Sequence, residues 1–257
     1  MSDVVLTLRQ LTYTNRAFWR NPASAFFTFA FPLMFLVIFT ALFSGTTAAL
    51  GLNVSTSTYY IPAIASFSII TATYTNLAVS VTFLRDGGTL KRIRGTPMPA
   101  ASYLTARIVH AILVAIFLVV IVTVFGVAFY HAHVTARTLP AFLVTIVVGA
   151  ASFSALGLAL TAVIPNADAA PAVVNGSILP LLFLSGVFIP LPSHTTWYVA
   201  LAKIFPVYHF THALLFAFFL PVGNGFQGND LLILGVWGVV GLLAAVRFFV
   251  WEPRGGA

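Results

Sequence analysis

The stretch IVHAILVAIFLVVIVTVFGVAF, residues 108–129, contains no aspartate, glutamate, lysine or arginine. At 1.5 Å per residue, a helix of this length crosses the roughly 30 Å hydrocarbon core of a bilayer. Its continuous apolar character favours a helix over a strand of an outer-membrane barrel, in which apolar and polar residues alternate. The stretch therefore predicts a transmembrane helix.

Five further stretches share this character, and together they predict an all-α polytopic membrane protein with six transmembrane helices. The six predicted spans are residues 23–43, 60–83, 108–129, 139–164, 172–189 and 231–250. Only 7% of the 257 residues are charged, against about 25% in an ordinary soluble domain. No linker-like stretch divides the chain, so we expect residues 1–257 to form one membrane domain.

The basic residues predict how the chain is oriented. Two of the twelve lysines and arginines, Arg137 and Lys203, fall on one side of the predicted membrane. The other ten fall on the opposite side: Arg9, Arg16, Arg20, Arg85, Lys91, Arg92, Arg94, Arg107, Arg247 and Arg254. Cytoplasmic loops carry the excess of basic residues, so both termini are predicted to be cytoplasmic. This topology also explains the net charge of +7 without a nucleic-acid partner. The chain shows no separate targeting segment, and we expect it in a bacterial cytoplasmic (inner) membrane.

Residues 1–22 predict an amphipathic helix at the cytoplasmic interface. Apolar residues recur at helical spacing, and three arginines recur at seven and four residues on another face. These residues are Val4, Leu8, Leu11 and Phe18, and Arg9, Arg16 and Arg20. Such a helix binds anionic headgroups or a partner protein, and a simple topology anchor is the alternative.

The cytoplasmic loop LRDGGTLKRIRGTPMPAASYLTAR, residues 84–107, carries five of the twelve basic residues. Gly87 and Gly88 break the incoming helix, and Thr89 can cap a new one that Gly95 ends. The pattern predicts a short helix over Thr89–Arg94, which could transmit motion into two spans. The alternative is a basic loop that only fixes topology.

The region between the last two predicted spans, residues 190–230, is expected to form an external re-entrant hairpin. Its apolar stretch, Val207–Leu220, is too short to span and lies between Pro206 and Pro221.

Three segments together resemble the permeases of ABC-2-type exporters, the drug-resistance and lipid or glycan export group that includes the daunorubicin-resistance permeases. The first is Gly88-Thr89-Leu90 followed by a basic pair, Ile93, Arg94 and Thr96-Pro97; the second is Arg20-Asn21-Pro22 before a span with Pro32. The third, Asn175–Leu215, contains Ser-Gly-x-x-x-Pro and Trp…Phe-Pro-x-Tyr. Lys91 departs from several relatives, which carry an acidic residue there.

The resemblance implies a coupling helix that docks on a separate cytoplasmic ATPase. The implied coupling residues are Gly88, Thr89, Leu90, Lys91, Arg92, Ile93, Arg94, Thr96 and Pro97, with Arg9, Arg16 and Arg20 on the helix beside it. The implied external gate residues are Trp197, Phe205, Pro206 and Tyr208. Two permease chains, identical or not, would pair with two ATPase copies and export a hydrophobic or amphipathic substrate: a drug, a lipid or a lipid-linked glycan.

The chain lacks the motif that binds ATP in such transporters. A phosphate-binding loop needs Gly-x-x-x-x-Gly-Lys followed by Ser or Thr, whereas Lys91 precedes Arg92 and Lys203 precedes Ile204. We therefore expect no cofactor on this chain and no enzymatic activity of its own; ATP and Mg²⁺ would bind the partner ATPase.

Two other hypotheses, an intramembrane protease and a metal site, have less support in the sequence than a permease. Ser185-Gly186 with His209 and His212 could suggest an intramembrane protease, but Phe183 stands where a rhomboid-type nucleophile needs glycine. His131, His133 and His194 have no accompanying carboxylate, so no metal site is expected.

Polar residues inside the spans are the candidates for lining a pathway. Four recur on one helical face of residues 60–83 and two lie in residues 172–189: Ser66, Thr73, Asn76 and Ser80, and Asn175 and Ser177. Hydrogen bonding between helices is the alternative role. Asp168 falls in a turn and Asp230 at the outer end of the last span, which disfavours a proton-coupled carrier. The alternative function is an ATPase-independent secondary carrier or a membrane scaffold.

Small residues form one flank of the last span: Gly235, Gly238, Gly241 and Ala245. They permit close helix approach, either within the chain or at a subunit interface.

Overall fold

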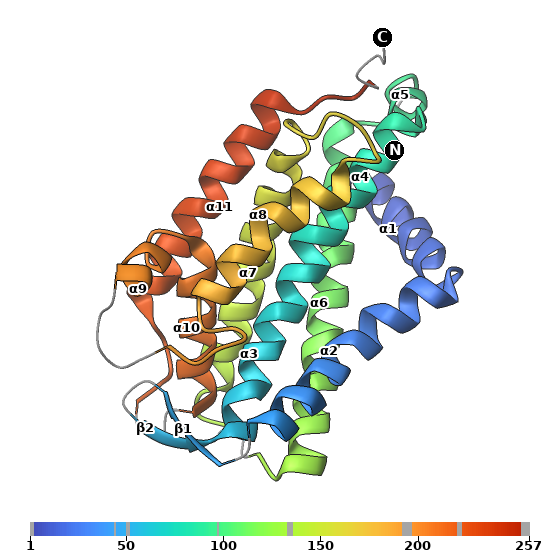
Figure 1. Cartoon of the computed structure of the whole chain (residues 1–257). Coiled ribbons are helices and arrows are strands. Elements are labelled where there is room, and N and C mark those ends of the chain that lie inside the picture. Colours follow the sequence, from blue (N-terminus) through green and yellow to red (C-terminus); the bar gives the residue numbers. More distant parts are fainter. Residues whose placement is uncertain are drawn as a thin grey trace.

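The structure is a computed structural model that describes residues 3–43, 45–49, 52–96, 98–132, 136–191, 197–219 and 223–252. It is a helical bundle with one short β-hairpin (Figure 1). The first helices are α1 (Asp3–Trp19), α2 (Pro22–Leu42), α3 (Thr56–Ile70), the π-helical turn η1 (Thr71–Thr75), α4 (Asn76–Asp86) and α5 (Thr89–Arg94). The remaining helices are α6 (Ala100–Tyr130), α7 (Leu139–Leu160), α8 (Ala170–Leu184), α9 (Trp197–Ala202), α10 (Pro206–Phe219) and α11 (Gly228–Phe248). The hairpin pairs β1 (Thr46–Ala49) antiparallel with β2 (Leu52–Ser55).

The two ends of the bundle are formed by different elements. Helices α1 and α5 and the last turn of α11 lie at one end, called here the α5 end, and the β-hairpin lies at the opposite end (Figure 1).

Helix α3 runs through the middle of the bundle and packs against α2, α6, α7 and α10. Its residues from Tyr59 to Ile70 are all buried, so α3 is the centre of the core.

Five helical segments are long and apolar enough to cross a membrane: Ala25–Leu42, Thr56–Asp86, Ser102–Tyr130, Leu139–Leu160 and Gly228–Phe248. They correspond to five of the six predicted spans and confirm a polytopic, mainly helical membrane protein. Two segments are longer than predicted, because α3, η1 and α4 form one run to Asp86 and α6 already begins at Ala100.

The stretch predicted as a span at 172–189 differs from the structure. Helix α8 ends at Leu184, and at 15 residues it covers about 22 Å, less than the hydrocarbon core. The helix ends there because Gly186 takes a positive φ of 80°, which breaks the helical path.

The polar face predicted for residues 60–83 is divided by the π turn. Ser66 and Thr73 are fully buried, whereas Asn76 is exposed and Ser80 is half-buried. A π turn inserts one extra residue, which rotates the following helix by about 100° relative to an uninterrupted α-helix. The prediction of a single polar face was therefore wrong: α4 presents Asn76 and Ser80 in a different direction from the α3 residues.

Helices α7 and α11 approach closely because small residues face each other. The Ser152 hydroxyl of α7 donates to the Leu234 carbonyl of α11 at 3.0 Å. A Cβ at Gly241 would lie 2.9 Å from the Leu156 amide nitrogen, whereas a Cβ at Gly235 would meet nothing within 4 Å. The small flank of α11 thus serves packing within the chain at Gly241 but not at Gly235.

We expect Gly241→Ala to destabilise the protein and the matched Gly235→Ala not to. The methyl group at position 241 forces the α7 backbone to move, and overpacking of this kind costs about 1–3 kcal/mol. Thermal unfolding in detergent, followed by tryptophan fluorescence, measures the difference. Equal melting temperatures for the two variants would contradict the packing role of Gly241.

Candidate functional site

Helix α5 is amphipathic and forms where the loop sequence predicts it, at Thr89–Arg94. Leu90 is fully buried and Ile93 packs against the same apolar cluster, which also contains Val81 of α4 and Tyr103 of α6. The opposite side of α5 is exposed and basic. It consists of Lys91, Arg92 and Arg94.

The ends of α5 are set by Gly88, which precedes it, and by Thr96, two residues after its last residue. Gly88 takes φ +70°, a left-handed conformation that a residue with a Cβ rarely adopts. The expected cap, Thr89, is instead the first helical residue, because the sharp turn at Gly88 occupies the cap position. After Arg94, the Thr96 hydroxyl donates to the Ile93 carbonyl at 2.7 Å and closes the last turn. Pro97 lies outside the described residues.

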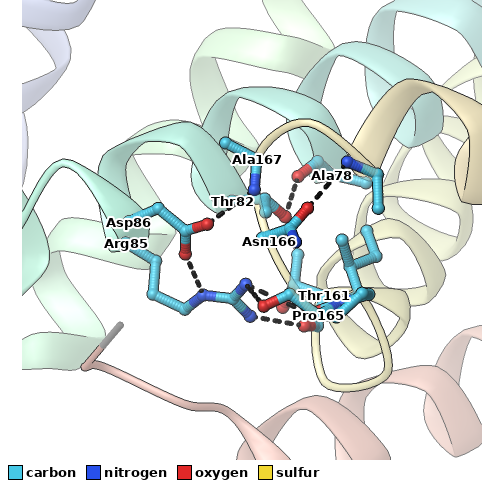
Figure 2. A network of polar contacts seen from close by, with 10 residues as sticks. Ala78, Thr82, Arg85, Asp86, Thr161, Pro165, Asn166 and Ala167 are labelled. Carbon is cyan, nitrogen blue, oxygen red and sulfur yellow. Dashed lines mark hydrogen bonds and ion pairs between the residues drawn. The ribbon is translucent and has the colours of Figure 1, made fainter. Parts of the chain in front are cut away.

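A buried arginine links the helix before α5 to the α7–α8 connection (Figure 2). The Arg85 side chain at the end of α4 is 1% exposed. Its guanidinium donates to the carbonyls of Thr161 and Ile164 at 3.0 Å each, and to that of Pro165 at 3.2 Å.

Asp86 completes this network, which is called here the Arg85 clamp. Its carboxylate accepts from Arg85 Nε at 2.9 Å and from the amide of Ala167 at 2.5 Å. The three carbonyls lie in the connection that follows the last residue of α7, Leu160, and the guanidinium satisfies them. The clamp therefore fixes α4, and with it the start of α5, to the end of α7 and the start of α8.

Sequence reasoning treated Arg85 only as one of the basic residues that set topology. Adjacent opposite charges at the end of a predicted span are a signal that could have identified it, because isolated charges there are costly. The main-chain carbonyls that it binds lie 76 to 80 residues away in the chain, and no spacing pattern reveals them.

The N-terminal helix α1 packs along the first half of α6 and against the start of α2. The Ser102 hydroxyl of α6 donates to the Asp3 carbonyl at 3.5 Å. Further along, Phe18 contacts His110 and Trp19 contacts Phe117, with ring centroids 5.6 and 6.5 Å apart. The three basic residues of its outer surface, Arg9, Arg16 and Arg20, are all exposed.

Five of the six pathway candidates fall into three environments. Ser66 and Thr73 donate to carbonyls of their own helical run, at 3.0 and 2.6 Å. Asn76 and Ser80 line a cavity beside α1 and α6. Asn175 is exposed on α8.

Ser177 joins two of the external gate candidates at a second cavity of about 410 Å³. Its hydroxyl forms a 2.8 Å hydrogen bond with the Tyr74 hydroxyl of η1. Phe205 and Pro206 line the same cavity, which is mostly apolar. The structure thus brings together one pathway candidate and two gate candidates that are distant in the sequence.

The other two gate candidates lie elsewhere. Trp197 is 78% exposed at the start of α9. Tyr208 stacks on His212 with ring centroids 5.5 Å apart.

A buried acid–histidine cluster joins α10 to α11, and sequence reasoning missed it. The two Asp230 carboxylate oxygens bind His209 Nδ1 and His212 Nδ1, each at 2.7 Å. The other ring nitrogen of His209 lies 2.8 Å from the Lys203 carbonyl. Asp230 was placed at the outer end of its span, but it is only 6% exposed. The three-residue spacing of the histidines, which puts both on one helical face, was the available signal.

The structure gives no support to the hypothesis of an intramembrane protease with Ser185 and His209. The Ser185 hydroxyl is buried and has no hydrogen-bond partner among the described residues. Both ring nitrogens of His209 are engaged, as described above, so this histidine is not available to activate a serine. Of the histidines considered for a metal, His133 and His194 lie outside the described residues.

We expect Arg85→Gln to destabilise the protein by about 3 kcal/mol, because it leaves Asp86 and three main-chain carbonyls without their partner. The control is Arg92→Gln, which removes an exposed charge from α5 and should change stability by less than about 0.5 kcal/mol. Thermal unfolding in detergent compares the two variants. If Arg85→Gln melts like the control, the clamp does not hold the α7–α8 connection.

The comparisons with known proteins agree with this architecture. The model of the ABC-2 type transporter family matches residues 5–219. No curated protein matches the chain. The match covers most of the 257 residues, including all but the first two residues of α1, the α5 region, the Arg85 clamp and α10. The chain belongs to the ABC-2 type transporter family, and it is a transmembrane permease component of an ABC transporter.

Proposed function

We propose that this permease moves a hydrophobic or amphipathic substrate outward, driven by ATP hydrolysis in a separate ATPase subunit. The observation that carries the proposal is the two-sided construction of α5. Leu90 anchors α5 in the bundle, while Lys91, Arg92 and Arg94 are exposed and can meet an acidic surface on a partner; Arg94 also lies 3.9 Å from the Glu252 carboxylate.

The Arg85 clamp gives α5 a mechanical connection to the rest of the bundle. A force on α5 reaches α4 through two glycines. It then reaches the α7–α8 connection through hydrogen bonds from Arg85 to main-chain carbonyls and from the Ala167 amide to Asp86. Closure of two ATPase copies on ATP would push on α5 in each of two permease chains. The push would shift the population from an inward-open to an outward-open arrangement of the spans.

The distribution of basic residues supports an orientation of the chain in the membrane. The α5 end carries the basic residues of α1 and α5, and cytoplasmic segments carry the excess of lysine and arginine. We therefore place the α5 end in the cytoplasm and the β-hairpin outside, in a bacterial inner membrane. On this orientation the cavity at Ser177 and Phe205 lies on the outward route, and its apolar lining supports a drug, a lipid or a lipid-linked glycan as substrate.

We expect the double variant Lys91→Glu, Arg92→Glu to lose its ATPase partner while still inserting into the membrane. Both side chains are exposed, so charge reversal opposes docking without disturbing the core. The measurement is a tagged pull-down from native membranes in mild detergent, with mass spectrometry of the co-purifying chains. The wild-type chain should bring down a stoichiometric protein that contains Gly-x-x-x-x-Gly-Lys-Ser/Thr.

The matched control is Arg137→Glu, an exposed residue just before α7, which should retain the partner. Loss of the partner in both variants would indicate a general effect of charge and contradict the coupling role of α5. Absence of any ATPase from the wild-type pull-down, even after cross-linking at Lys91, would contradict the whole proposal and favour a gradient-driven carrier.

A further inference from the structure

A cavity of about 400 Å³ with several polar side chains in its lining lies between α1, the η1–α4 segment and α6. Ligand pockets in proteins are commonly of about this size or larger. The polar side chains in its lining come from all three elements, and they are Thr14, Asn76, Ser80, Arg107 and His110. This cavity is called here the Arg107 cavity.

Arg107 carries a positive charge that no carboxylate neutralises in the described part of the chain. Its Nε donates to the Tyr103 hydroxyl at 2.8 Å and its Nη1 donates to the Ser80 hydroxyl at 3.2 Å. Both acceptors are neutral. A guanidinium has five N–H donors, so three of them remain for a ligand.

Two further polar atoms in the cavity are buried without a partner. His110 Nε2 and the Thr14 hydroxyl make no hydrogen bond among the described residues. Buried polar atoms are usually paired, and an unpaired one costs about 1–3 kcal/mol. A ligand with several acceptor oxygens would satisfy the free guanidinium donors, and rotation of the His110 and Thr14 side chains would bring these two covered atoms to the same ligand. A phosphate group has this chemistry.

A smaller cavity, of about 270 Å³, adjoins the Arg107 cavity, and the two share Ala72 and Asn76 in their linings. Three aromatic rings, those of Phe27, Phe31 and Phe67, line the smaller cavity, which contains no charged side chain. An arginine in one cavity and aromatic rings in the next fit a ligand that carries both a phosphate and a hydrocarbon chain.

The position of Arg107 along α6 fits the headgroup region of a bilayer. The 31 residues of α6 extend about 46 Å, which exceeds the hydrocarbon core by about 16 Å. Arg107 is the eighth residue from the α5 end, so in a centred helix it lies close to that boundary. Val4 and Leu8 of α1 are exposed nearby, which is consistent with lipid around this part of the molecule.

From these observations we propose that the Arg107 cavity binds an anionic lipid of the leaflet at the α5 end. The phosphate accepts hydrogen bonds from Arg107, and from His110 and Thr14 once their side chains rotate toward it, while an acyl chain enters the adjoining cavity lined by phenylalanines. The proposal concerns binding, so it is independent of ATPase coupling and can hold or fail by itself.

The test is isothermal titration calorimetry of the full chain in a non-ionic detergent. The probes are dioctanoyl phosphatidic acid, dioctanoyl phosphatidylcholine and glycerol 3-phosphate. We expect phosphatidic acid to bind at least about tenfold more tightly than phosphatidylcholine, whose choline cation opposes Arg107. Glycerol 3-phosphate should bind more weakly than either lipid, because it has no acyl chain to bury.

Arg107→Gln should weaken phosphatidic acid binding about tenfold or more, because charge-assisted hydrogen bonds are lost. The matched control, Arg247→Gln, removes an exposed charge from the last turn of α11 and should leave the dissociation constant unchanged. Thr14→Glu provides a second variant, since a carboxylate in the cavity neutralises Arg107 and competes with the phosphate.

Three results would overturn the proposal. Unchanged lipid affinity in both Arg107→Gln and Thr14→Glu would remove the cavity as the binding site. An equal loss in Arg247→Gln would show only diffuse attraction to a basic surface. Glycerol 3-phosphate binding as tightly as phosphatidic acid would assign the site to a soluble anion instead of a lipid.

Discussion

The bundle depends on one constraint, which is that main-chain polar groups buried among membrane spans need partners inside the protein. At the end of α7 the chain leaves its helix while still covered by α4 and α8. The Arg85 guanidinium meets the three carbonyls exposed there, and Asp86 meets the amide that begins the next turn. An apolar side chain at position 85 could pack but could not satisfy these groups. The position of α5 follows, because α5 begins at Thr89, four residues after Arg85.

The two sides of the α5 end have different chemistry. On one side, the Arg85 clamp and the apolar cluster around Leu90 join α4, α6, α7 and the end of α11 into a continuous body. On the other side, between α1, α4 and α6, packing is incomplete and polar atoms lack partners. A rigid connection suits the transmission of force, and an incompletely filled polar cavity suits the binding of a ligand. The π turn contributes to the second side, because it rotates Asn76 and Ser80 toward that cavity.

In the C-terminal part of the chain, α10 is fixed to α11 by the Asp230 carboxylate, which lies between two histidines. The indole of Trp237 adds a hydrogen bond from α11 to the Ile204 carbonyl at 3.2 Å. The segment that follows α8 is fixed separately: the Tyr59 hydroxyl donates to the Gly186 carbonyl, and the Tyr60 hydroxyl donates to the Phe188 carbonyl at 3.0 Å. Specific polar contacts to neighbouring helices therefore hold α10 and the segment after α8 in place.

The membrane class, most of the span positions and the six residues of α5 could be predicted from the amino-acid sequence. These features depend on local properties: apolar length against bilayer thickness, glycines that break a helix, and basic residues at helical spacing. Features that depend on contacts distant in the chain became apparent only once the helices were packed together. Arg85 binds carbonyls nearly 80 residues away, and Asp230 binds two histidines on another helix. No residue pattern predicts the π turn. It turns Asn76 and Ser80 away from the direction of Ser66 and Thr73, although regular helical spacing places all four on one face. Local composition sets how far a helix can reach, whereas the partner of a buried polar group is chosen by how the helices pack.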